Sequence, residues 1–214
     1  MKYLFVIFCL ASFNASALDW DVQLSGGFTT IDDIKIKPFT LVETGTVNAS
    51  LEYDDTFSYG IAVGMSGFEQ HNVLRLALSW QGLDADFDSA DLVSTGGTEL
   101  PAVNGSASSG ELKAAGLDFD NSINIYTVEL HYLFPTSGSW VPYFGAGGGI
   151  ADIENADQET VFNFLIGLDY KIGDSSRLGI KAQRFFIDEI TDDLGIEYDS
   201  FDVDMFSLVW TYSF

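Results

Sequence analysis

Apolar and polar residues alternate with a period of two along eight stretches of the chain, which predicts strands with two unlike faces. The last stretch is the clearest. Its large apolar face consists of Phe206, Leu208, Trp210, Tyr212 and Phe214, and its other face is mostly small or polar. The earlier stretches cover about 19–30, 55–66, 73–83, 121–134, 160–172 and 177–187, with one more beginning near Val141. Glycines blur the facing of that strand, where Phe144 and Ile150 are expected to point outward.

The connections between these strands alternate between long and short, which a soluble sandwich has no reason to show. Long connections, at about 31–54, 84–120, 152–159 and 188–200, follow the first, third, fifth and seventh strands. This order is typical of an up-and-down membrane barrel, with turns on the periplasmic side and longer loops outside. The long connections are expected to be loops. The stretch from Ser94 to Gly110 is rich in serine and glycine and is expected to be mobile.

The polar face decides between a soluble barrel and a membrane barrel. Five charged or titratable residues fall on it, namely Arg75, Glu129, His131, Asp169 and Lys181. These side chains suit the lumen of a barrel whose large apolar residues face lipid. An eight-stranded barrel is just wide enough for side chains to fill it. Opposite charges would pair there and plug the lumen, because an unpaired buried charge is costly, and a conducting filter is the alternative.

Aromatic residues bracket the outward faces at both ends, as expected of two membrane interfaces. Toward the short turns lie Trp20, Tyr132, Phe134, Tyr170, Trp210, Tyr212 and Phe214. Toward the long connections lie Phe28, Phe57, Tyr59, Trp80, Tyr126 and Phe162.

Charge is strongly unbalanced, with 9 basic and 32 acidic residues and a formal net charge of −23. The long connections carry 6, 8, 4 and 6 of the acidic residues when Asp55, at the edge of the first connection, is counted, so the acids gather at one end of the predicted barrel. Their only basic residues are Lys35, Lys37 and Lys113. A surface this acidic argues against binding to nucleic acid, whose backbone needs cations.

The first 17 residues have the pattern of a secretory signal peptide. Lys2 precedes an apolar run from Tyr3 to Phe13, and Ala15-Ser16-Ala17 is an A-x-A cleavage site. The mature chain is expected to begin near Leu18. Since Cys9 lies within the signal, the mature chain would have no disulfide and no thiol nucleophile. The body of the chain has no apolar run of about 18 residues, as a transmembrane helix would need.

The signal ending at Ala17, the P-Y-F-G-A-G-G-G stretch at 142–149 and the closing Trp210, Tyr212 and Phe214 together resemble the small eight-stranded outer-membrane barrels. That group includes the outer membrane protein A transmembrane domain and the opacity-type surface antigens. The resemblance implies an all-β, eight-stranded antiparallel up-and-down transmembrane barrel over 18–214. No peptidoglycan-binding domain is expected after it.

The same resemblance implies a place in the outer membrane of a Gram-negative cell, after export to the periplasm and removal of the signal peptide. The barrel would contact outer-membrane lipid and lipopolysaccharide as a monomer. Its last strand would be read by the barrel-assembly machinery, with Trp210, Tyr212 and Phe214 as the signal.

Three functions remain open from the sequence. The first is a structural or surface-interaction role through acidic extracellular loops. The second is a narrow channel for small solutes or ions. The third is a lipid-modifying enzyme, as in barrels that resemble lipid A deacylases or palmitoyltransferases. His71 is expected in a periplasmic turn and His131 in the lumen, and no G-x-S-x-G occurs. We therefore predict no catalytic residues and no enzyme.

One short motif bears on metal binding. Asp84, Asp86 and Asp88 form the D-x-D-x-D opening of a calcium loop, but Ser89 replaces the required glycine and Thr95 the bidentate glutamate. No firm metal site and no cofactor are predicted. The loop acids would lie beside lipopolysaccharide phosphates, so weak binding of Ca²⁺ or Mg²⁺ is expected.

Overall fold

The structure is a computed structural model that describes residues 18–41, 45–67, 73–94, 103–114, 120–154, 156–191 and 196–214. The predicted signal peptide and His71 lie outside the described residues. Within the described ranges, no helix has the length and apolar character needed to cross a membrane.

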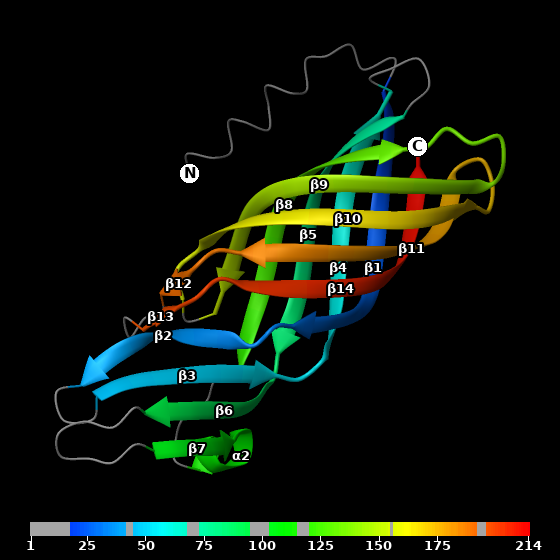
Figure 1. The fold of residues 1–214 in the computed structure, drawn as a ribbon. Coiled ribbons are helices and arrows are strands. Elements are labelled where there is room, and N and C mark those ends of the chain that lie inside the picture. Colours follow the sequence, from blue (N-terminus) through cyan, green and yellow to red (C-terminus); the bar gives the residue numbers. More distant parts are fainter. Residues whose placement is uncertain are drawn as a thin grey trace.

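Eight antiparallel strands close into a barrel in the order β1-β14-β11-β10-β9-β8-β5-β4, with β4 pairing back onto β1 (Figure 1). The strands are β1 (Asp19–Ile31), β4 (Thr56–Ser66), β5 (Leu74–Ala85), β8 (Asn121–Leu133), β9 (Trp140–Ile153), β10 (Glu159–Lys171), β11 (Ser176–Ile187) and β14 (Phe201–Ser213). The predicted fold class is confirmed, and each predicted strand begins and ends within a few residues of an observed one. Each of the eight strands pairs on both sides, so the backbone hydrogen bonds of the wall are made within the sheet.

The prediction that the long connections are loops was wrong for three of the four, because these carry a second sheet of six strands, whereas no strand of that sheet is described between β9 and β10. Its order is β12-β13-β2-β3-β6-β7. The strands are β2 (Ile34–Leu41), β3 (Gly45–Tyr53), β6 (Phe87–Ser94), β7 (Val103–Ser108), β12 (Ile190–Thr191) and β13 (Glu197–Tyr198). A short helix, α2 (Ser109–Ala114), follows β7. In the stretch from Ser94 to Gly110, Ser94 ends β6, 103–110 form β7 and the start of α2, and 95–102 lie outside the described residues, so the mobility of this stretch stays a prediction.

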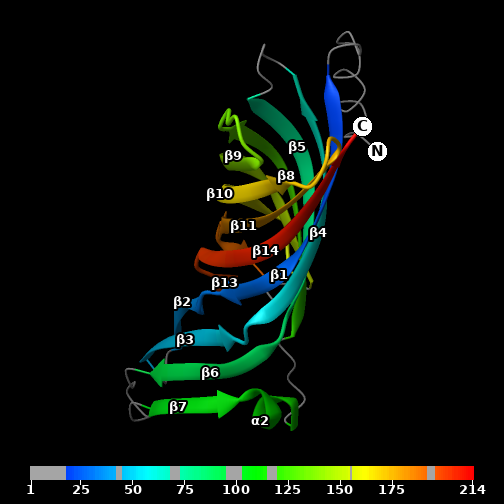
Figure 2. The same ribbon diagram turned by 90° about the vertical axis from the view of Figure 1, so that its right-hand side faces the viewer.

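The second sheet continues the barrel wall at the end opposite the C-terminus (Figures 1 and 2). Only Asp32 and Asp33 separate β1 from β2, and only Asp86 separates β5 from β6. We call this end of the barrel the sheet end and the opposite end, which carries the short connections, the turn end.

The outward face of the barrel strands is mostly large and apolar. Phe144 and Ile150 of β9 point outward as predicted and are 49% and 44% exposed. Ring pairs form on this face at both ends, for example Trp140 with Tyr170 at the turn end and Tyr59 with Trp80 toward the sheet end. A membrane surrounds such a wall more favourably than water does.

The inward face is mostly polar in the half of the lumen near the turn end and mostly apolar toward the sheet end, where Thr29 and Ser58 are buried polar exceptions, which corrects our expectation of a small and polar face along every strand. The apolar residues toward the sheet end form one buried cluster with the second sheet. The barrel part of this cluster includes Ile123, Ile125, Val161, Phe185, Ile187, Val203 and Met205. The second sheet adds Ile34, Leu51, Phe87 and Tyr198.

Candidate functional site

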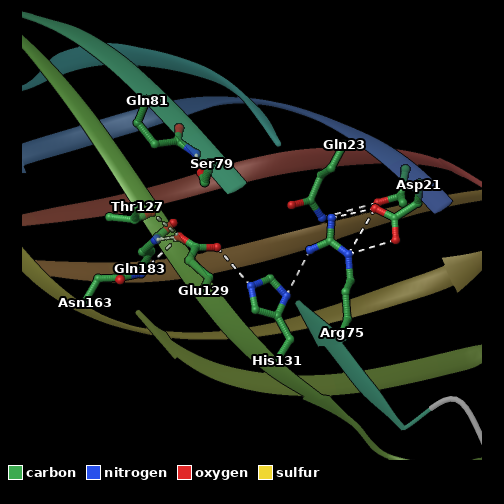
Figure 3. A network of polar contacts seen from close by, with 11 residues as sticks. Asp21, Gln23, Arg75, Ser79, Gln81, Thr127, Glu129, His131, Asn163 and Gln183 are labelled. Atoms are coloured by element: carbon green, nitrogen blue, oxygen red, sulfur yellow. Dashed lines mark hydrogen bonds and ion pairs between the residues drawn. The ribbon is translucent and has the colours of Figure 1, made fainter. Parts of the chain in front are cut away.

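All five charged or titratable residues that the sequence pattern assigned to the lumen lie inside the barrel. Arg75, Glu129, His131, Asp169 and Lys181 are each between 1% and 3% exposed. They come from β5, β8, β10 and β11, because alternate residues of these strands point inward. Three of the five, Arg75, His131 and Glu129, are joined in one hydrogen-bonded network (Figure 3).

The network begins with a buried ion pair between Arg75 and Asp21 of β1. The guanidinium donates to both carboxylate oxygens, with Nη2 2.6 Å from Oδ1 and Nε 2.9 Å from Oδ2. The side chain of Arg75 reaches across β4, where Gly64 leaves room, because a Cβ at Gly64 would overlap the guanidinium. Asp21 was not among the residues predicted for the lumen, although it shares the inward face of its strand with Gln23.

His131 links this pair to Glu129 and is held in one tautomer. Arginine can only donate, so the Arg75 Nη1, 3.1 Å away, makes the His131 Nδ1 an acceptor. The His131 Nε2 then carries the proton and donates to the Glu129 Oε2 at 2.9 Å. Both ring nitrogens are therefore occupied, and the imidazole needs no positive charge to hold its place.

Glu129 is surrounded by donors on its other oxygen as well. Its Oε1 accepts from Thr127 Oγ1 at 3.1 Å, Asn163 Nδ2 at 3.1 Å and Gln183 Nε2 at 2.7 Å. With His131 on Oε2, the carboxylate has four side-chain partners. A carboxylate so fully engaged is a poor general base, since its lone pairs are already taken.

Asp169 and Lys181 lie beside the network but outside its chain of hydrogen bonds. Arg177 bridges two carboxylates loosely, with its Nε 3.9 Å from Asp169 and its Nη2 4.0 Å from Asp21. Lys181 is 2% exposed, and its side chain lies near the opposite charges of Glu129 and Asp169. The lumen near the turn end thus holds buried cations and anions close to one another, which compensates their charges.

The three aspartates of the D-x-D-x-D stretch do not have the arrangement of a calcium loop. Asp84, Asp86 and Asp88 are exposed and alternate with the buried Leu83, Ala85 and Phe87 along an extended backbone from β5 into β6. A calcium loop instead curves so that its oxygens converge. In the described part of the chain, no group of three or more histidine, cysteine or acidic side chains could hold a metal ion.

The sheet end carries exposed ion pairs within a surface that is mostly acidic. Lys37 of β2 pairs with Glu189 and, at 3.5 Å, with Glu197. Its hydrogen bond with Glu189 raises the pKa of the Lys37 ammonium. Glu111 of α2 accepts from the backbone N–H of Ser108, which lowers the pKa of that carboxyl. These contacts order the surface locally but leave it acidic.

The closing aromatic residues of β14 lie on the outward face at the turn end. Trp210, Tyr212 and Phe214 form a continuous row in which each ring contacts the next. The backbone N–H of Phe214 donates to the carbonyl of Trp20 at 2.8 Å, which fastens the chain end to β1. Their reading by an assembly machinery stays a prediction.

Comparisons with known proteins show what the fold resembles. No family model and no curated protein sequence matches the chain. Among solved structures, Neisserial surface protein A is similar with a TM-score of 0.54 and 14% identity, over 91% of this chain and 97% of that chain. The outer membrane protease OmpT from Escherichia coli is similar with a TM-score of 0.50 and 7% identity, over 92% of this chain and 97% of that chain.

These identities are too low to indicate a shared activity, so the likeness concerns the fold. The closed barrel of eight antiparallel strands, its apolar outer wall and its likeness to Neisserial surface protein A lead to one conclusion. The chain has the fold of the small outer-membrane β-barrels.

Proposed function

We propose that this chain is a non-conducting outer-membrane surface protein that presents its acidic second sheet to the exterior. The observation that carries the proposal is the filling of the lumen by two unlike layers. The layer near the turn end is the ion network around Arg75 and Glu129, and the layer near the sheet end is the apolar cluster.

Each layer opposes the passage of water and ions for its own reason. In the polar layer, Arg75 is paired with Asp21 and four donors enclose the Glu129 carboxylate, and separating these groups would leave buried charges without partners. In the apolar layer, side chains such as Phe185 and Ile125, both 0% exposed, fill the space that water would need. An apolar constriction also resists wetting.

The second sheet is suited to contacts because it offers both a surface and an edge. Leu92 and Val93 of β6 are 41% and 46% exposed, next to the exposed Asp91. Among the strands that the structure describes, the outer strand β7 pairs only with β6, so its other side is a sheet edge. Such an edge can accept an added strand from a partner.

Planar-bilayer recordings test the proposal. The wild-type barrel is expected to show no steady openings. Glu129→Ala removes the acceptor of four side-chain donors, and Lys181→Ala removes a buried cation, so both variants are expected to leak or to lose stability. Lys113→Ala, in the exposed α2, is the control and is expected to behave as wild type.

Steady wild-type openings whose size changes in Glu129→Ala and Lys181→Ala would contradict the proposal. They would favour instead a narrow channel for small solutes or ions. A lipid-modifying enzyme remains the third hypothesis, and the engagement of both His131 nitrogens and both Glu129 oxygens argues against it.

The acidic surface leads to a separate prediction about divalent cations. With a formal net charge of −23, the carboxylates of the sheet end repel one another and the phosphates of lipopolysaccharide. Millimolar Ca²⁺ or Mg²⁺ is therefore expected to raise the melting temperature and to slow amide exchange in β2, β3 and β6. The matched control is Na⁺ at equal ionic strength. Equal effects of Ca²⁺ and Na⁺ would show that ionic screening alone stabilises the protein, and would contradict binding of divalent cations.

The remaining partners follow from the membrane location. The barrel contacts outer-membrane lipid through its apolar wall, with lipopolysaccharide beside the sheet end. We propose a monomer, since the barrel closes on itself without a second chain.

A further inference from the structure

The second sheet has two edges, and they differ in how well they are protected from pairing with another strand. The edge strand β12 is two residues long, and its Thr191 carbonyl accepts from the backbone N–H of Asp157 at 3.1 Å. The strand at the other edge, β7, is six residues long and has no charged residue and no proline. Natural sheets usually shorten, charge or cover such strands, because an open edge pairs readily. Figures 1 and 2 show β7 as the outermost strand of the second sheet.

The backbone of β7 offers hydrogen-bonding groups on the side away from β6. The N–H of Ser108 donates to the Glu111 carboxylate at 3.0 Å and is therefore not directed at β6. Successive residues of an antiparallel strand direct their N–H and C=O groups to alternate sides. The N–H and C=O groups of the exposed Asn104 and Ser106 are therefore also directed away from β6, where an added strand would pair with them.

One face of this edge has a place for a large apolar side chain. Ala90 of β6 packs against the buried core cluster, so Leu92, two residues along, lies on the same face of the strand. Leu92 is 41% exposed, and its neighbour on β7 is Gly105. Nothing lies within 4 Å of a Cβ built at Gly105. A large apolar side chain opposite Gly105 on an added strand would therefore cover Leu92.

The other face has a place for a basic side chain. Asp91 of β6 is exposed and lies between two small residues, Ser106 of β7 and Ser50 of β3. An arginine or lysine opposite Ser106 on an added strand would have to cross only β7 to reach the Asp91 carboxylate. The barrel contains a contact of this reach, since the Arg75 side chain crosses β4 to bind Asp21.

The charges around this edge favour a basic partner. Glu111, beside the end of β7, adds a second exposed carboxylate. Lys113 of α2 pairs with Asp120, and among the described residues Lys35 of β2 forms no ion pair with Asp91. A second copy of this chain would bring the same acids and a formal net charge of −23, so its approach would be opposed by repulsion.

We propose that β7 accepts an extended segment of a partner protein as an added strand, with basic side chains toward Asp91 and large apolar side chains toward Leu92. Basic and large apolar residues would therefore alternate along the partner segment. This pairing rests on the proposed function, because a partner reaches β7 only if the second sheet is presented to the exterior.

Fluorescence anisotropy of a labelled peptide, added to the whole protein in neutral detergent micelles, tests the site. The peptide alternates lysine and valine. One control peptide has the same composition with its lysines and valines in separate blocks, another has glutamate in place of lysine, and empty micelles give the background. Only the alternating basic peptide is expected to bind, and its binding is expected to slow amide exchange in β7.

Variants of the protein locate the binding. Ser106→Pro removes an outward N–H and is expected to weaken binding about tenfold, whereas Ser106→Ala is expected to have no effect. Asp91→Asn is expected to weaken binding about threefold, as befits an exposed ion pair. Asp88→Asn is its matched control, because Asp88 is also exposed on β6 but lies beyond the residues that pair with β7.

Equal binding of the alternating and blocked peptides to wild type would overturn the proposal, and this comparison needs no variant. Unchanged binding by Ser106→Pro would also overturn it, as would a wild-type dimer that Ser106→Pro abolishes, since the edge would then belong to a second copy. Bilayer recordings test the proposed function separately. A silent barrel that fails to bind the peptide would contradict only the strand pairing, whereas steady openings would contradict the proposed function.

Discussion

Replacement of Arg75 by alanine is expected to lower the free energy of unfolding of the barrel by about 3–5 kcal/mol, because it leaves a buried charge without its partner. Asp21 would lose the guanidinium that binds both of its oxygens, and His131 would lose its donor on Nδ1. Arg177, 4.0 Å from Asp21, is too far to replace these hydrogen bonds. Urea unfolding in lipid vesicles, followed by tryptophan fluorescence, measures the loss.

Two further variants separate the buried pair from charge in general. Lys113→Ala breaks an ion pair whose side chains are 44% and 36% exposed, and its effect is expected to stay below about 1 kcal/mol. Asp21→Leu combined with Arg75→Met removes both buried charges and is expected to recover much of the loss. A double variant as unstable as Arg75→Ala would show that the two side chains do more than neutralise each other's charge.

Replacement of Gly149 by alanine is expected to destabilise the barrel by about 1–3 kcal/mol or to prevent its assembly, because the new Cβ overpacks a strand interface. A Cβ at this position of β9 would overlap the carbonyl oxygen of Tyr126 on β8 and stand 2.8 Å from the Cα of Thr127. Both neighbours are backbone atoms and cannot rotate away, so the two strands must separate locally. The same unfolding experiment in vesicles measures the effect.

Gly138→Ala is the control for this substitution, because nothing lies within 4 Å of a Cβ there. It lies in the turn between β8 and β9 and is expected to leave stability unchanged. If both alanine variants behaved alike, close approach of the strands would not be the reason for glycine in β9.

The barrel could be predicted from the sequence because the two faces of its strands meet unlike environments, lipid on the outside and the lumen on the inside. Lipid requires large apolar side chains at every second position, so residues such as Leu208 and Trp210 mark the outward face without help from packing. The same alternation assigned Arg75 and Glu129 to the lumen. Asp21 was not predicted for the lumen network, because its strand has several polar residues on the inward face. Only the side chain of Arg75, which extends across Gly64, distinguishes Asp21 from the others.

The second sheet was not predicted from the sequence, for a different reason. Ile34, Lys35, Ile36 and Lys37 alternate as a strand should, but Pro38 follows them and acids surround them. The structure places Pro38 where the register between β2 and β3 shifts, at a bulge that needs no amide donor.

The apolar half of the lumen was missed because one inward face changes character along its length. On β8, the inward residues run from Ile123 and Ile125 to Thr127, Glu129 and His131. Periodicity gives the side of the sheet, but it does not say whether that side meets water, charge or an apolar core. Only the second sheet, which packs against the end of the barrel, makes those isoleucines interior.

The second sheet also limits how this chain can change over generations. Exposed loops usually tolerate insertions and drift freely. Here Leu51 and Phe87 are packed in the core, and β3 pairs on both sides, so a single inserted residue would turn buried side chains outward. Divergence among descendants should therefore collect at outward positions such as Asp88 and Asp91. Any partner of the second sheet would therefore meet a surface of fixed shape whose chemistry varies.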